Sequence, residues 1–139
     1  NRAHAVWNGN LKKGKGTLGL ETSGQEFSFS FSSRFEDETG TNPEELIAAA
    51  HAGCFSMAFS GLLSEEGYEP VSVSTKAEVT VVKNNGGFRI SKSKLITDVK
   101  VPGIDHEKFQ KLAQTAKENC PVSGALSSLE IELEANLNP

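Results

Sequence analysis

The sequence predicts an α+β fold in which a mainly antiparallel sheet wraps around a buried central helix. Three features of the 139 residues predict it. Residues 25–33 and 71–81 alternate apolar and polar side chains, as half-buried strands do. Residues 46–63 contain no Asp, Glu, Lys or Arg and are too long for a strand. The predicted order is strands, helix, hairpin, helix and strand, which is typical of α+β domains.

Length and composition favour a single domain spanning residues 1–139. Fourteen basic and eighteen acidic residues give a net charge of −4, without a clustered basic stripe. A nucleic-acid partner is therefore not expected. The N-terminal residues lack the apolar core of a signal peptide, and two cysteines do not make a disulfide scaffold. We therefore expect a reducing, cytoplasmic setting.

The first third of the chain predicts short strands separated by glycine. Residues 5–8 and 17–21 flank a glycine-rich turn, which indicates a hairpin. The alternation in 25–33 predicts a strand whose Phe27, Phe29 and Phe31 share one face. Residues 34–40 are then expected to form a polar loop.

A helix start is well signalled after this loop. Asn42 suits the N-cap, Pro43 the first helical position, and Glu45 the return carboxylate of a capping box. The helix is expected to continue to Glu66, where Gly67 stops it. Because it is apolar on every face, we place it in the centre of the structure.

A helix buried on all sides is difficult to cover with one sheet and one further helix. A second copy of the chain would cover it, so an intertwined homodimer is expected. The same run is about long enough for a membrane span. His51, several Ser and Gly residues and the absence of flanking basic residues argue against a membrane location.

The second half of the chain continues the α+β pattern. A strand over 71–81 leads into a turn at 84–87 and a return strand over 88–101. The apolar phase of the return strand shifts between Ile90 and Leu95, which predicts a β-bulge. Asp105 is expected to cap a second helix, and residues 129–137 form the last strand.

Two cysteines are the candidate reactive groups. A thiolate is the strongest nucleophile that a protein offers without a cofactor, and a second thiol can reset its oxidised forms. Cys54 lies in the apolar helix, where it also suits simple packing. Cys120 ends the second helix, whose negative C-terminus is expected to raise its thiol pKa. The 65 residues between them exclude a CxxC motif, and no ligand spacing predicts a metal or cofactor.

Two further residues bear on Cys54. His51 lies three positions before it, so a Cys–His nucleophile pair is one interpretation, and a histidine satisfied within the core is the other. Arg34 could stabilise a thiolate and hold a substrate oxygen, or could be a solvated loop residue. In the first case, Glu44 or Glu45 would fix the guanidinium fork.

Several long motifs in order resemble one known family. These are TNPEELIAAAHAGCFSMA at 41–58 and AKENCPVS at 116–123, supported by WNG at 7–9, GKGT at 14–17, RFE at 34–36 and VPGID at 101–105. The chain resembles the OsmC/Ohr family, the osmotically inducible protein C and organic hydroperoxide resistance proteins. The OsmC branch is the more similar, and the resemblance covers nearly the whole chain.

This resemblance implies a thiol peroxidase that prefers organic hydroperoxides over hydrogen peroxide and protects against oxidative stress. By position, Cys54 matches the peroxidatic cysteine and Cys120 the resolving cysteine. Glu44 matches the catalytic glutamate and Arg34 the arginine. An external dithiol, of the dihydrolipoyl type in the family, would reduce the Cys54–Cys120 disulfide.

The position of Glu44 adds a geometric expectation. It precedes Cys54 by ten residues on one helix, about 15 Å along the axis. We therefore expect part of the site, including Glu44, to come from the partner subunit of a homodimer with antiparallel central helices.

Two other functions remain open from the sequence. One is a hydrolase or transferase that uses Cys54 and His51. The other is a non-catalytic dimer that binds an apolar ligand with both thiols inert.

Overall fold

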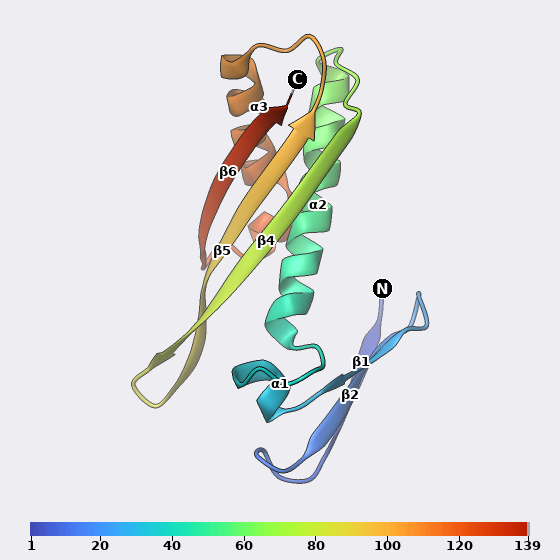
Figure 1. The fold of residues 1–139 in the computed structure, drawn as a ribbon, viewed down its shortest axis with the longest axis vertical. Helices are drawn as coiled ribbons and strands as arrows, with labels where there is room; N and C mark the ends of the chain where they lie inside the picture. The colour runs from blue at the N-terminus through green and yellow to red at the C-terminus, as the bar shows by residue number, and fades with distance from the viewer. Residues whose placement is uncertain (139) are drawn as a thin grey trace. The chain divides into compact units, whose positions relative to one another are not determined.

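The computed structural model describes residues 1–138 and divides into two compact units, Asn1–Leu46 and Ile47–Pro139 (Figure 1). We call them the N-terminal and C-terminal units and describe each by itself. Each contains a three-stranded sheet and helical segments, which confirms the α+β class. The organisation of residues 1–139 as one domain stays a prediction.

The N-terminal unit is built on an antiparallel sheet of order β1-β2-β3. Its strands are β1 (Ala3–Asn8), β2 (Lys15–Leu20) and β3 (Glu26–Phe29). The hairpin predicted around the glycine-rich turn is confirmed by the β1–β2 pairing. A Cβ at Gly16 would collide with the rings of Trp7 and Phe29, so this strand position requires glycine.

The strand predicted over 25–33 is too long. It ends at Phe29, and Ser30 becomes the N-cap of a short helix, α1 (Phe31–Phe35). The Ser30 hydroxyl accepts from the Ser33 backbone N–H, and the Ser33 hydroxyl accepts from the Ser30 backbone N–H. Ser30 and Ser33 are three residues apart, which is capping-box spacing and not the period of two of a strand face, and the cap prevails here. Arg34 therefore lies on α1 and not in the expected polar loop.

The predicted start of the central helix, α2 (Pro43–Glu65), is confirmed. The Asn42 side-chain oxygen accepts from the Glu45 backbone N–H at 2.8 Å. The Glu45 carboxylate does not complete the expected capping box; it accepts from the Thr41 hydroxyl at 2.7 Å. Gly67, with φ +88°, lies just beyond the helix end and marks its expected stop.

The C-terminal unit contains a second sheet of order β4-β5-β6. The strands are β4 (Ser72–Asn84), β5 (Gly87–Lys100) and β6 (Glu130–Asn138). β4 and β5 form the predicted hairpin, with the expected bulge where the register shifts between Thr80 and Val81. β6 pairs with β5 in parallel, which the sequence did not indicate. The intervening helices provide the crossover that a parallel pair needs.

Two helices precede β6. The Asp105 carboxylate accepts from the Lys108 backbone N–H at 2.8 Å, which confirms it as the cap of α3 (His106–Asn119). A further helix, α4 (Pro121–Ala125), was not predicted. Cys120 is the C-cap of α3 and the N-cap of α4. This double position decides the environment of its sulfur.

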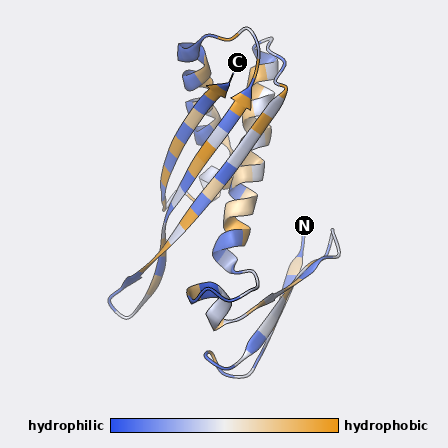
Figure 2. Ribbon diagram, in the orientation of Figure 1, coloured by the Kyte–Doolittle hydropathy of each residue, from blue (hydrophilic) through white to orange (hydrophobic). Residues whose placement is uncertain are grey.

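The core of the C-terminal unit lies between its sheet and the helices α2 and α3, which cover the same face of the sheet (Figure 1). Figure 2 shows apolar residues at intervals along the strands that alternate with polar ones. The largest apolar side chains that are fully buried here are Phe55, Phe59, Leu63, Leu95, Val99 and Phe109.

The expectation that α2 is buried on every face is wrong for the single chain. Every fourth residue from His51 to Leu63 is buried, whereas the opposite side is exposed. Met57 on that side is 78% exposed. The exposed apolar face of α2 consists of Ala49, Ala50, Gly53, Met57 and Gly61. By length and composition α2 could also cross a membrane, a test that helices from protein cores pass equally.

Candidate active site

The C-terminal unit brings its two cysteines together. Cys54 lies half-buried on α2, and Cys120 lies buried at the junction of α3 and α4. Both are free thiols, and the Cys54 thiol donates a hydrogen bond to the Cys120 sulfur. The fold therefore brings together two thiols that have 65 residues between them in the sequence, as a disulfide between them requires.

The start of α4 surrounds the Cys120 sulfur with donors. The backbone N–H groups of Val122 and Ser123 donate to it, and so does the Ser123 hydroxyl. The Val122 N–H also faces the Cys54 sulfur. The first N–H groups of a helix have no partner within the helix, so they are available to an acceptor at the cap.

These donors reverse the expectation for Cys120. Burial by itself raises the thiol pKa, but the hydrogen bonds from Cys54, Ser123 and Val122 outweigh it, and the pKa of Cys120 is lowered. The expected rise considered only the C-terminus of α3. It is wrong because α4 begins at the same residue and directs its N–H groups at the sulfur.

Cys54 shows the opposite shift. Burial and then the hydrogen bond to Cys120 raise its thiol pKa, and the Val122 N–H offsets this only in part. None of these contributions within the C-terminal unit comes from a cation. A raised pKa leaves a small thiolate fraction at neutral pH, so a reactive Cys54 requires a positive group beside it.

His51 is committed to a buried network and not to Cys54. Its Nδ1 lies 2.7 Å from the Ser93 hydroxyl and its Nε2 lies 2.8 Å from the Ser123 hydroxyl. The ring is fully buried, and burial lowers the histidine pKa, so the ring is neutral. With both nitrogens occupied, a Cys54–His51 nucleophile pair is wrong, and the interpretation as a satisfied core histidine is confirmed.

The two serines of this network were not found from the sequence. Ser123 follows Cys120 at capping distance within AKENCPVS, which is a usable signal. No sequence signal marks Ser93, because it is the fold that brings β5 beside α2.

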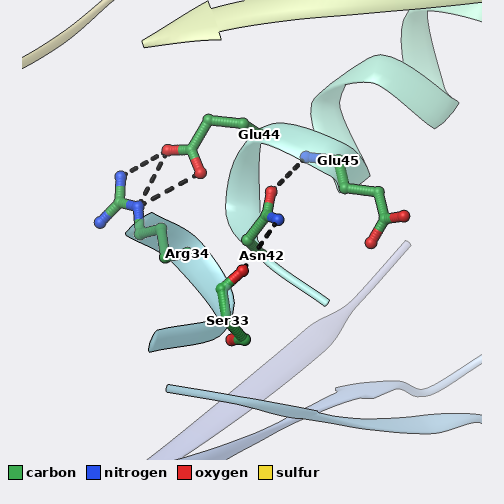
Figure 3. A network of polar contacts seen from close by, with 5 residues as sticks. All are labelled: Ser33, Arg34, Asn42, Glu44 and Glu45. Carbon is green, nitrogen blue, oxygen red and sulfur yellow. Dashed lines mark hydrogen bonds and ion pairs between the residues drawn. The ribbon is translucent and has the colours of Figure 1, made fainter. Parts of the chain in front are cut away.

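The N-terminal unit holds the other two candidate residues in contact. The Arg34 Nη2 and Nε atoms lie 2.6 and 3.0 Å from Glu44 Oε1, and Nε lies 3.2 Å from Oε2 (Figure 3). The Glu44 side chain is 7% exposed and that of Arg34 is 36% exposed. Of the two carboxylates considered, Glu44 therefore fixes the guanidinium fork.

An apolar pocket of about 260 Å³ adjoins Arg34. The Arg34 guanidinium carbon lies 5.0 Å from the centroid of the Phe35 ring, a cation–π contact. This leaves a charged group, one-third exposed, at the edge of an aromatic surface. The pocket is lined by Trp7, Leu11, Phe29, Ser30, Phe31, Arg34, Phe35 and Pro43.

The fold and these contacts define an α+β protein with an adjacent pair of thiols in one unit and an arginine–carboxylate pair in the other. The family model described as "OsmC-like protein" matches residues 36–134. The chain belongs to this OsmC family.

Individual relatives agree with this assignment. "Peroxiredoxin OsmC" of Escherichia coli K12 is 47% identical over 137 residues, which cover 98% of this chain and 95% of that protein. "Organic hydroperoxide resistance protein OhrB" of Bacillus subtilis is 36% identical over 102 residues, which cover 71% and 72%.

Solved structures share the fold. The crystal structure of the Bacillus subtilis OhrB protein superposes with a TM-score of 0.73 and 26% identity, covering 99% of this chain and 98% of that one. An OsmC-like protein from Mycoplasma pneumoniae gives a TM-score of 0.76 at 14% identity, covering 99% and 96%. The latter supports the fold alone.

Proposed function

We propose that this chain is a thiol-dependent peroxidase that reduces organic hydroperoxides and, more weakly, hydrogen peroxide, and so protects against oxidative stress. The observation that carries the proposal is the hydrogen bond between the Cys54 and Cys120 thiols. The names of the relatives, a peroxiredoxin and an organic hydroperoxide resistance protein, support the same activity.

The first step oxidises Cys54. Its thiolate attacks the distal oxygen of the hydroperoxide, the O–O bond breaks, and the alkoxide leaves and takes up a proton to form the alcohol. Cys54 is left as a sulfenic acid. Cys54 packs against a cluster of apolar side chains that includes Phe55 and Phe59, which favours an organic hydroperoxide over hydrogen peroxide.

The second step joins the two cysteines. The Cys120 sulfur attacks the Cys54 sulfur, an S–S bond forms, the S–O bond breaks, and hydroxide leaves and is protonated to water. An external dithiol then reduces the disulfide through a mixed disulfide. We propose a dihydrolipoyl-type reductant and a cytoplasmic location, where such reducing thiols are maintained.

Arg34 is proposed as the positive group that Cys54 needs. It would bind the peroxide oxygen and favour the thiolate, with Glu44 orienting its fork. Glu44 and Cys54 are ten residues apart on α2, about 15 Å in a regular helix. We therefore propose that the Arg34–Glu44 pair of one chain serves the thiols of a partner chain in a homodimer.

The exposed apolar face of α2 supports the dimer. We expect Met57→Glu to shift the protein from dimer to monomer, because it places a charge in the centre of a face that a second α2 would cover. Size-exclusion chromatography with light scattering measures this. Val82→Glu, at an exposed apolar position of β4, is the matched control and should leave the dimer intact. Equal masses for Met57→Glu and the unaltered protein would contradict the proposed interface.

The function itself is tested by substrate preference. We expect faster turnover with a bulky organic hydroperoxide than with hydrogen peroxide when dihydrolipoamide is the reductant. Turnover is followed by loss of the hydroperoxide, with protein alkylated at both thiols as the control. Equally slow turnover of both oxidants would favour the alternative function, a non-catalytic dimer that binds an apolar ligand.

A further inference from the structure

A continuous line of buried polar contacts leads from β5 to the two thiols. The Ser93 hydroxyl contacts His51 Nδ1, His51 Nε2 contacts the Ser123 hydroxyl, and the Ser123 hydroxyl contacts the Cys120 sulfur. We call Ser93, His51 and Ser123 the serine–histidine chain. His51 and Ser93 are fully buried and Ser123 is 5% exposed, so bulk water does not compete for these contacts.

The chemistry of the groups gives this chain a direction. A serine hydroxyl has one proton to donate, and a neutral imidazole has one N–H. Ser123 donates to the Cys120 sulfur, so it must accept from His51, which puts the ring proton on Nε2. His51 Nδ1 then accepts from the Ser93 hydroxyl. If the ring proton were on Nδ1, Ser123 would give its proton to His51 and lose its bond to Cys120.

We propose that His51 is a positioning residue for the resolving step, which holds the Ser123 hydroxyl so that it donates to the Cys120 sulfur and stabilises that sulfur as a thiolate. This inference rests on the proposed peroxidase function. It assigns His51 to Cys120, which it reaches through Ser123, and gives it no part in the attack of Cys54 on the hydroperoxide.

The chain prepares Cys120 for the reaction that follows oxidation of Cys54. The Cys120 thiolate supplies the electron pair of the new S–S bond, and the hydroxide that leaves Cys54 takes up the proton that Cys120 gave up earlier.

The charged side chains near the serine–histidine chain have partners of their own. Lys117 donates to the Ile131 carbonyl, Lys92 pairs with Glu132, and Lys94 pairs with Glu134. Cys54 is the ionisable group that acts directly on Cys120.

The test measures ionisation of Cys120 without any peroxide. In a Cys54→Ser background, the rate of Cys120 alkylation is followed against pH. Adding His51→Leu should move the midpoint of this profile upward by about one pH unit, because a hydrogen bond to a charged group is weakened. With His51→Gln in place of His51→Leu, the side-chain amide can still donate to Ser123. The upward shift of the midpoint should therefore be smaller.

The matched control is Thr97→Val in the same background. Thr97 is fully buried, and its hydroxyl bonds to Thr75 and to the Ser74 carbonyl, not to Ser93, His51 or Ser123. It should leave the midpoint unchanged. An unchanged midpoint in His51→Leu, or an equal shift in Thr97→Val, would overturn the inference. If His51→Leu does not fold, Ser93→Ala carries the test, with a smaller upward shift expected and no shift overturning the inference.

A kinetic arm separates this inference from the proposed function. With both cysteines present, His51→Leu should not slow formation of the Cys54 sulfenic acid but should close the disulfide about tenfold more slowly at neutral pH. Failure of the unaltered protein to form a sulfenic acid would refute the peroxidase function. Normal disulfide closure in His51→Leu would refute the role of His51 alone.

Discussion

Replacing Cys54 with serine is expected to reduce hydroperoxide turnover to the uncatalysed rate. A serine hydroxyl is not ionised at neutral pH and forms no sulfenic acid, so the first step is lost entirely.

Replacing Cys120 with serine is expected to have a different result. The Cys54 sulfenic acid still forms once, but no disulfide follows, and turnover with a dithiol stops. Rapid-mixing measurements of hydroperoxide consumption, with and without the dithiol, distinguish the two variants.

The pH dependence of the first step gives this pair a further check. Because burial and Cys120 raise the pKa of Cys54, the rate of its oxidation should increase as pH rises through that pKa. Removing Cys120 removes one of the two causes, so the profile of Cys120→Ser should move to lower pH. A shift to higher pH would contradict the assignment of Cys120 as a cause of the raised pKa.

Replacing Arg34 is expected to have the second largest effect. Arg34→Ala should slow oxidation of Cys54 by roughly 10²–10³-fold, as the loss of one stabilising donor at a reacting oxygen does elsewhere. It also leaves the buried Glu44 carboxylate without its partner. Arg34→Lys keeps the charge and a partner for Glu44 but lacks the planar fork, so it should fold and still lose most of the rate.

The control for Arg34 is another arginine. Arg89 is exposed on β5, and Arg89→Ala should leave the rate unchanged. Urea unfolding of each variant separates a loss of stability from a loss of rate. A folded Arg34→Lys that oxidises Cys54 as fast as the unaltered protein would show that Arg34 is only a structural partner of Glu44.

Local signals in the sequence predict much of this fold. Three features were predicted correctly because each depends on a few neighbouring residues. They are the cap at Asn42, the cap at Asp105 and the bulge in β5. The helix α1 was missed because the alternation of phenylalanine and serine over residues 27–32 continues the strand pattern past Ser30, where the helix cap begins. The parallel pairing of β6 depends on contacts far apart in the chain, which no local pattern encodes.

The candidate site divides in the same way. Residue type and motif indicated both cysteines, Arg34 and its partner Glu44. The ionisation of Cys120 was predicted in the wrong direction because α4, only five residues long, has no periodic signal of its own. The serine–histidine chain joins three elements, so its members could be connected only after folding.

The central claim is that Cys54 and Cys120 form one redox pair, and free-thiol counting tests it most directly. Reduced protein is treated with one equivalent of an organic hydroperoxide, and the remaining thiols are counted and the peptides mapped. We predict that both thiols disappear and that Cys54 is found joined to Cys120 within one chain. Survival of both thiols, or over-oxidation of Cys54 with Cys120 still free, would contradict the account.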